Sequence, residues 1–272
     1  MSELPPPKDD ALYIPVVGQQ SKDKHFFLNN YIGIFTTSMR RKWKLHYVDL
    51  FAGAGMEKLK DSGQINWGSP LIAANTRFPF QRLHLCEKNR RKFGALESRI
   101  LEILPDSQVL CGDANEKVHA IVGEIENEGS LSLAFLDPYG LDLAFETLRA
   151  LATIRADLII FFPDRLDVLR NWKQYYYDDR ESKLDRHLGS DSNWRSVLDN
   201  APPNKRVEHL RSLYVQRLKE KLGYLHVEYE RIPTQGRPLY YLVFCSRSEL
   251  GARFWRDICR NKRDGQKTFR FE

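Results

Sequence analysis

Five short apolar runs alternate with helical patterns along the first 163 residues, and this alternation constrains the fold more than any other feature. The predicted strands occupy residues 46–51, 82–87, 107–112, 131–136 and 157–162. The predicted helices occupy residues 22–41, 69–76, 89–103, 114–127 and 143–153. Ser21 is the expected N-cap of the first helix and Ser69 that of the second. Such alternation is typical of parallel βαβ units joined by right-handed crossovers. We therefore expect an α/β, Rossmann-like domain.

The pattern changes after Pro163. Residues 164–222 are charged and helical in pattern, which predicts a helical insertion. Two strand signals, Leu225–Ile232 and Pro238–Cys245, then follow across the turn-forming residues Pro233–Gly236, which predicts an antiparallel pair. Together with the five parallel strands, this pair predicts a seven-stranded, mostly parallel sheet with a terminal antiparallel hairpin.

The ends of the chain define the expected domain. Residues 1–18 contain three consecutive prolines and little apolar content, so we expect a flexible N-terminal arm. Residues 19–272 are expected to form one domain that includes the insertion. For the loop of residues 56–67 we keep two alternatives, a lid over the site and a plain insertion.

Composition and residue spacing indicate which cellular environment and which kinds of partner we expect. No apolar run is long enough to cross a bilayer, so we expect no membrane partner. The four cysteines form no CxxC pair and the seven histidines show no metal-ligand spacing, so we expect no metal site and a cytoplasmic setting. A net charge of +6 is compatible with a nucleic-acid partner and equally with a mildly basic soluble protein.

Acidic residues and glycines mark the ends of the first three predicted strands. Gly53 and Gly55 let the backbone turn sharply after Asp49 and approach a ligand that a Cβ would block. Glu87 ends the second strand, where an acidic side chain typically binds ribose hydroxyls, and Asp113 ends the third. The alternatives are a structural tight turn for the glycines and helix capping for Asp113.

This set of strand ends predicts an S-adenosylmethionine site. A dinucleotide is disfavoured because the third glycine of its fingerprint is missing, and no P-loop motif occurs. The candidate cofactor-binding residues are Asp49, Phe51, Ala52, Gly53, Gly55, Glu87, Asp113 and Ala114.

A second motif, Asp137-Pro138-Tyr139-Gly140, ends the fourth predicted strand. It resembles the Asp-Pro-Pro-Tyr type motif of methyltransferases that modify exocyclic amino groups of nucleobases, and more closely the Asp-Pro-Phe-Gly motif of a guanine-N2 transfer RNA methyltransferase family. The resemblance implies that Asp137 and the Pro138 carbonyl accept hydrogen bonds from the target amine while Tyr139 stacks on the base. The alternative is ordinary turn chemistry at a strand end.

The motifs together resemble the three-Cys-motif partner family, TcmP, over about residues 20–200. The segments that carry this likeness are Asp49–Gly55, Gly68–Pro70, Glu87, Gly112–Asn115, Phe135–Gly140 and Phe162–Pro163. The resemblance implies a class I methyltransferase fold and a radical-SAM-like protein with three cysteines as partner.

Three functional hypotheses follow. The leading one is a SAM-dependent methyltransferase that acts on a nucleobase amine in DNA or RNA. The second is a non-catalytic or accessory SAM-binding partner of the radical-SAM-like protein in a modification or defence pathway. The third, a nuclease or other hydrolase, is the weakest because the carboxylates are already accounted for by the cofactor site.

Two further features could serve a nucleic acid. Arg253, Arg256 and Arg260 are spaced along one helical face, and aromatic residues cluster between Trp172 and Tyr177. The alternatives are a solvated basic helix and a set of core aromatics.

Overall fold

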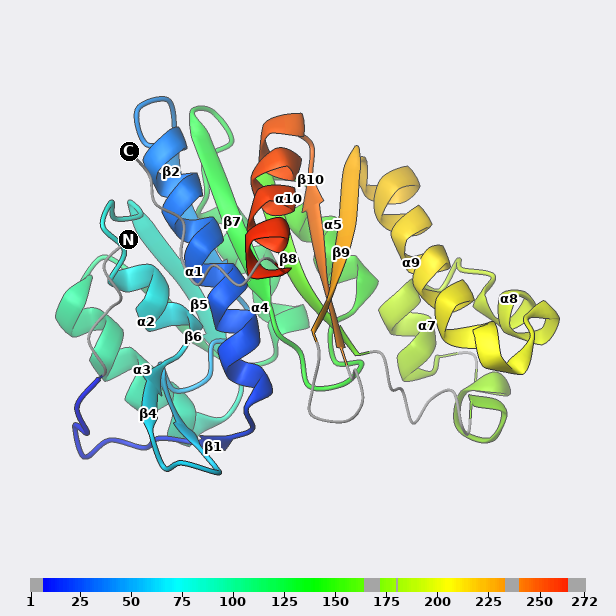
Figure 1. Cartoon of the computed structure of the whole chain (residues 1–272), viewed down its shortest axis with the longest axis horizontal. Coiled ribbons are helices and arrows are strands. Elements are labelled where there is room, and N and C mark those ends of the chain that lie inside the picture. The colour runs from blue at the N-terminus through cyan, green and yellow to red at the C-terminus, as the bar shows by residue number, and fades with distance from the viewer. Residues whose placement is uncertain (1–6, 164–171, 180, 233–239, 264–272) are drawn as a thin grey trace.

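The computed structural model describes residues 7–163, 172–179, 181–232 and 240–263. Its centre is a seven-stranded sheet in the order β6-β5-β2-β7-β8-β10-β9 (Figure 1). The strands of this sheet are β2 (Lys44–Asp49), β5 (Arg82–Glu87), β6 (Gln108–Cys111), β7 (Ser130–Leu136), β8 (Ala156–Pro163), β9 (His226–Ile232) and β10 (Tyr240–Ser246). Neighbouring strands from β6 to β8 pair in parallel, whereas β10 runs antiparallel to both β8 and β9. The predicted sheet, with its terminal antiparallel hairpin, is confirmed.

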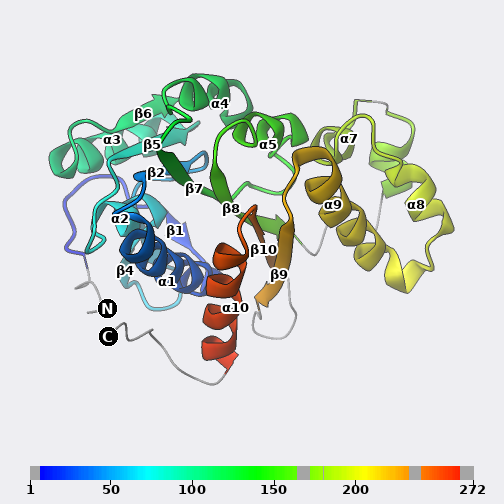
Figure 2. The ribbon, with the colours of Figure 1, turned by 90° about the horizontal axis from the view of Figure 1, so that it is seen from above.

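Helices cover both faces of the sheet. They are α1 (Gln20–Met39), α2 (Ser69–Ala74), α3 (Arg90–Ile103), α4 (Ala114–Gly123), α5 (Phe145–Leu151), α7 (Lys183–Leu188), α8 (Trp194–Asn200), α9 (Arg206–Leu222) and α10 (Glu249–Arg263). Two short helical turns, η1 (Lys173–Tyr177) and η2 (Pro203–Lys205), complete the set within the described ranges. Figure 2 shows α1 and α10 on one side of the sheet and α4, α5 and α9 on the other.

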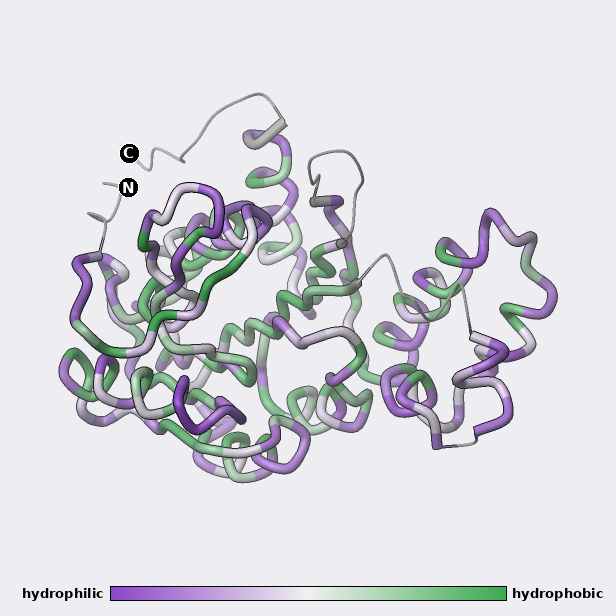
Figure 3. Tube along the Cα trace, turned by 90° about the horizontal axis from the view of Figure 1, so that it is seen from below, coloured by the Kyte–Doolittle hydropathy of each residue, from purple (hydrophilic) through white to green (hydrophobic). Residues whose placement is uncertain are grey.

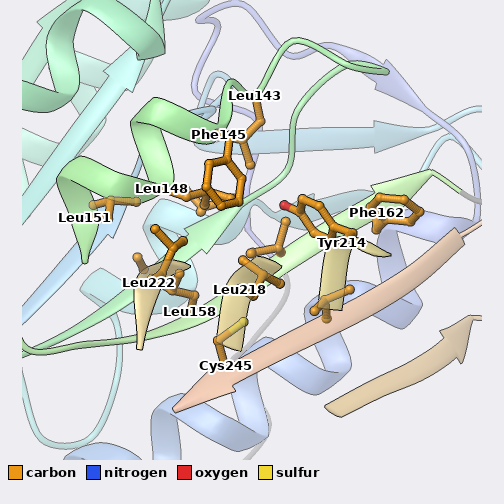
Figure 4. Packing of buried hydrophobic residues seen from close by; sticks show 14 of the residues in the cluster. Leu143, Phe145, Leu148, Leu151, Leu158, Phe162, Tyr214, Leu218, Leu222 and Cys245 are labelled. Carbon is orange, nitrogen blue, oxygen red and sulfur yellow. The ribbon is translucent and has the colours of Figure 1, made fainter. Parts of the chain in front are cut away.

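Alternation along the strands explains the two layers. In β7, Leu133 and Phe135 belong to the core that α1, α2, α3 and α10 cover, whereas Ala134 and Leu136 belong to the core on the opposite face. Successive side chains of a strand point to opposite faces, so a strand buried on both faces is a continuous apolar run. Figure 4 shows the second core, where the Tyr214 ring of α9 packs beside the Phe162 ring of β8.

The helical insertion extends beyond the β9 edge of the sheet (Figure 1). Within the insertion, the Asp185 carboxylate joins several side chains. It accepts hydrogen bonds from the Trp194 indole at 2.8 Å and from the Arg195 guanidinium at 2.6 Å. In Figure 3 the hydrophobic stretches gather in the region of the central strands, and the outer turns of the insertion are mostly hydrophilic. Of the predicted insertion, residues 164–171 and 180 lie outside the described residues, as does the turn Pro233–Gly236.

A small second sheet is the main departure from prediction. Its strands are β1 (Val16–Val17), β3 (Met56–Leu59) and β4 (Ile65–Trp67), in the order β1-β3-β4. The loop of residues 56–67 is therefore a hairpin, and Val16–Val17 of the expected flexible arm pair with it in parallel. Strands of two to four residues bury too few side chains to produce a period-two pattern, so the sequence does not reveal them.

No helix in the described ranges combines the length and apolarity needed to cross a membrane. No group of three or more His, Cys, Asp or Glu side chains among the described residues could hold a metal ion.

Candidate functional site

Two glycines shape the turn that follows β2. Gly53 and Gly55 have φ values of 67° and 83°, in the left-handed region that side chains disfavour. Gly68 then approaches this turn closely, because its N–H donates to the Gly55 carbonyl at 2.7 Å. A Cβ on Gly68 would lie only 2.8 Å from the same carbonyl oxygen. The turn is therefore held against the start of α2 by backbone contact.

Asp49 lies beneath this turn and is fully buried. Its carboxylate accepts hydrogen bonds from the Ser69 hydroxyl at 2.7 Å, the Phe51 N–H at 3.1 Å and the Tyr47 hydroxyl at 3.2 Å. Burial nevertheless raises the pKa of Asp49 to about 7. These contacts give Asp49 an internal role, the joining of β2 to α2, and its predicted contact with a cofactor stays a prediction.

The role of Ser69 differs from the predicted one. The expected N-cap of α2 is Ser69, but Gly68 occupies the N-cap position and Ser69 is the first helical residue. The same holds at α1, where the expected N-cap Ser21 lies inside a helix that begins at Gln20. Both hydroxyls donate instead to carboxylates from other elements, Ser69 to Asp49 and Ser21 to Glu57.

Glu87 reaches the glycine turn from the end of β5. One carboxylate oxygen accepts from the Gly53 N–H at 2.9 Å, and the other accepts from the Asn89 N–H at 2.7 Å. A carboxylate oxygen can accept more than one hydrogen bond, so Glu87 can still accept from ligand hydroxyls. Glu87 thus lies beside the glycine turn, which is the position that its predicted contact with ribose hydroxyls requires.

Asp113 caps the helix that follows β6. Its Oδ1 accepts from the Asn115 N–H at 2.9 Å, and its Oδ2 accepts from the Lys88 ammonium at 2.8 Å. Burial raises the pKa of Asp113, but the hydrogen bonds from Lys88 and Asn115 outweigh this and lower it overall. The capping alternative is therefore present in the structure, and the predicted cofactor contact stays a prediction.

The remaining candidates for cofactor contact lie around these carboxylates. Phe51 is half-buried, whereas Ala52 and Ala114 are buried. The Ala52 N–H donates to the Cys86 carbonyl at 3.0 Å, which ties the turn to β5. The predicted set is thus brought together at the carboxyl edge, meaning the end of the sheet where β2, β5, β6 and β7 finish.

The Asp137–Tyr139 motif lies at the same carboxyl edge. β7 pairs with β2 so that Phe135 is the partner of Asp49, and Asp137 follows directly after the end of β7. Pro138 is buried, but the Tyr139 side chain is 90% exposed. An aromatic ring with that exposure is free to stack on a planar ligand.

A helix far away in the sequence supplies residues that sequence reasoning missed. Lys24 of α1 forms an ion pair with Asp137, although 113 positions separate the two residues. His25 lies 3.8 Å from Glu57 of β3, the carboxylate that also accepts from Ser21. The apolar spacing of residues 22–41 predicts the helix, but no local signal shows that its polar face meets the carboxyl edge.

The N-terminal segment is tied to the glycine turn by Arg99 of α3. This guanidinium donates to the Ala54 carbonyl in the turn and to the Tyr13 carbonyl at 3.1 Å. It also forms a two-pronged pair with Asp10, both distances being 2.7 Å. We call residues 10–17 the N-terminal strap, because they cross from Arg99 to β3.

The aromatic and basic features divide between core and surface. Trp172 is buried and meets the Trp194 ring edge-on at 6.2 Å, whereas Tyr175 is 60% exposed. On α10, Arg256 pairs with Glu249 and Arg260 with Asp257, so these arginines have acidic partners on their own helix. These contacts favour a structural role for Trp172 and a solvated helix face for the arginines.

Comparisons with known proteins bear on the fold. No family model matches the chain, and no curated protein matches it. Among solved structures, the chain is similar to protein LPL1258 from Legionella pneumophila, of family DUF519, with a TM-score of 0.54 and 13% identity over 89% of this chain and 91% of that chain. This likeness and the observed sheet show a Rossmann-like α/β fold.

Two weaker likenesses involve proteins with bound ligands. One is an O-methyltransferase from Bacillus cereus in complex with SAH, with a TM-score of 0.46 and 13% identity over 83% of this chain and 81% of that chain. The other is M. jannaschii TYW2 in complex with AdoMet, with a TM-score of 0.42 and 12% identity over 84% of this chain and 75% of that chain.

Proposed function

We propose that this chain is a SAM-dependent methyltransferase that acts on an exocyclic amine of a nucleobase in DNA or RNA. The observation that carries the proposal is that two groups of residues lie together at the carboxyl edge. The first group is the glycine turn with Glu87, and the second is Asp137 with the exposed Tyr139. The first group suits a nucleoside-type cofactor and the second a planar amine substrate.

The residues of the turn fit S-adenosylmethionine. A Cβ built on Gly53 has no heavy atom within 4 Å, so the turn has open space on that side. Glu87 would accept from ribose hydroxyls, Asp113 would accept from the adenine amine, and the turn would allow close approach of the backbone. When bound, the cofactor supplies an electrophilic methyl group on a sulfonium.

The second group would act on the substrate. Asp137 and the Pro138 carbonyl would accept hydrogen bonds from the target amine, which favours the positive charge that develops on its nitrogen. Tyr139 would stack on the base and hold it in place. The finer assignment to the TcmP family, and with it a radical-SAM-like partner, rests on the sequence resemblance alone and belongs to this proposal.

The test is the transfer of radiolabelled methyl groups to separate pools of transfer RNA, ribosomal RNA, single-stranded DNA, double-stranded DNA and protein. We expect label in one nucleic-acid pool, and its loss in Asp137→Ala while SAM affinity changes by less than about threefold. SAM binding without label in any pool would instead favour the accessory-partner hypothesis.

A further inference from the structure

Lys24 is an almost buried cation at the carboxyl edge. Its side chain is 12% exposed and its ammonium pairs with Oδ2 of Asp137. The ammonium also lies 5.2 Å from the centre of the Phe161 ring in β8. Burying a lysine is costly unless its charge is compensated, so its place beside Asp137 requires an explanation.

The groups around Lys24 keep it charged. Burial lowers its pKa, but the charges of Asp137, Glu57 and Asp49 outweigh this effect and raise the pKa overall. Two further titratable groups lie in this cluster, His25 and Tyr47. Burial lowers the pKa of His25 and raises the pKa of Tyr47, so both are neutral at neutral pH. Lys24 is accordingly an ammonium and does not act as a general base.

We propose that Lys24 is a positioning residue for the methyl transfer proposed above: its ammonium holds Oδ2 of Asp137 and leaves Oδ1 to accept from the target amine. The inference rests on the proposed function. It names a residue of α1 that acts on the substrate only through Asp137.

Two physical effects support this role. The terminal torsion of an aspartate is broad, so a lone carboxylate rotates, whereas one whose oxygen is held by a fixed cation keeps its orientation. A pre-oriented acceptor needs no reorganisation when charge develops on the substrate. The pair with a cation also suits an ionised acceptor, which makes stronger hydrogen bonds than a neutral acid.

The alternative is that the ion pair only anchors α1 to the sheet. A purely structural pair would change the stability of the protein and would leave the kcat of the folded protein unchanged. A positioning pair would lower the kcat of the folded enzyme without a matching change in KM. The two roles therefore predict different kinetics for folded Lys24→Met.

The test compares Lys24→Met and Lys24→Arg with the control Lys44→Met. Lys44 also pairs with a carboxylate, Glu126 at 3.2 Å, but that pair is exposed and lies at the opposite end of β2. We expect Lys24→Met to lower kcat by about tenfold or more while KM for the nucleic acid and the affinity for SAM change by less than about threefold. Lys24→Arg restores most of the activity, and Lys44→Met retains it.

The comparison of kcat with KM separates the two roles further. A role in positioning Asp137 predicts that kcat falls while KM stays within about threefold, and that arginine at position 24 restores kcat. An unchanged kcat in the folded Lys24→Met protein would overturn the proposal.

A chemical measurement covers the case in which Lys24→Met does not fold. Acetic anhydride labelling of the wild-type protein, read by peptide mass spectrometry, should modify Lys24 at least about tenfold more slowly than Lys44, and the difference should narrow in Asp137→Asn. Equal reactivity of Lys24 in the two proteins would overturn the pairing. Absence of methyl transfer by the wild-type protein would instead remove the proposed function and the positioning role with it, while the labelling result would still decide the ion pair.

Discussion

Asp49 illustrates how a single buried carboxylate can organise a site. It is completely buried, and its hydrogen bonds join β2, the turn after it and the first residue of α2. Its raised pKa, about 7, means that its contribution to stability is fully present below its unfolded value near 3.8 and is lost as pH rises through about 7. Its donors matter most when it is ionised.

This pH dependence of the Asp49 contribution leads to a prediction for Ser69→Ala. Removing the hydroxyl should lower the free energy of unfolding by about 1–3 kcal/mol at about pH 8, where the carboxylate loses a donor, and by less at about pH 5, where Asp49 is protonated. Urea unfolding at both pH values measures this. The control is Ser98→Ala, because Ser98 is exposed and its hydroxyl donates to the Gly94 carbonyl of the same helix. An equal loss of unfolding free energy in Ser69→Ala at the two pH values would contradict the raised pKa of Asp49.

Glycine at position 68 is required by a close approach, and Gly94 provides the contrast. A Cβ at Gly68 would meet the Gly55 carbonyl, whereas a Cβ at Gly94 in α3 has nothing within 4 Å. We expect Gly68→Ala to lower the free energy of unfolding by about 1–3 kcal/mol. Gly94→Ala should raise it by about 0.5–1 kcal/mol, because glycine is costly inside a helix. Thermal or urea unfolding tests whether the free energy of unfolding changes in opposite directions in the two variants. An unchanged free energy of unfolding in Gly68→Ala would contradict the close contact between Gly68 and the turn.

At the scale of elements, the N-terminal strap and the β3–β4 hairpin form one unit beside the glycine turn. β1 pairs with β3, and Arg99 ties the strap to the turn through Tyr13 and Ala54. The Arg99 side chain is 4% exposed, and its hydrogen bond is the main cause that lowers the pKa of Asp10. Arg99 therefore joins the strap to the glycine turn.

The element-scale prediction concerns Arg99→Met. It should lower the free energy of unfolding by about 2–4 kcal/mol, because it leaves two carbonyls and a carboxylate without their donor. The matched control is Arg149→Met, which removes an exposed pair with Glu146 on one helix and should cost less than about 0.5 kcal/mol. Urea unfolding of both variants distinguishes them, and equal costs would contradict the role given to the strap.

At the scale of the whole molecule, the parts predicted from sequence are those marked by continuous apolar runs or by helical periodicity. The parallel strands are continuous apolar runs, and the acidic residues at or just after their ends meet at one edge because parallel strands end together. Lys24 and the strap could not be predicted in this way. Their partners lie 113 and 89 positions away, and a polar contact across such a separation leaves no local pattern.

The most direct measurement of the central claim is calorimetric titration of S-adenosylmethionine into the wild-type protein and into Glu87→Ala, with Lys44→Met as a control for charge removal away from the carboxyl edge. If the turn after β2 and Glu87 form the cofactor site, the wild-type and Lys44→Met proteins bind with the same affinity, and Glu87→Ala binds about tenfold or more weakly because the ribose loses an acceptor. Absence of binding by the folded wild-type protein, or equal affinity in Glu87→Ala, would contradict this account of the site.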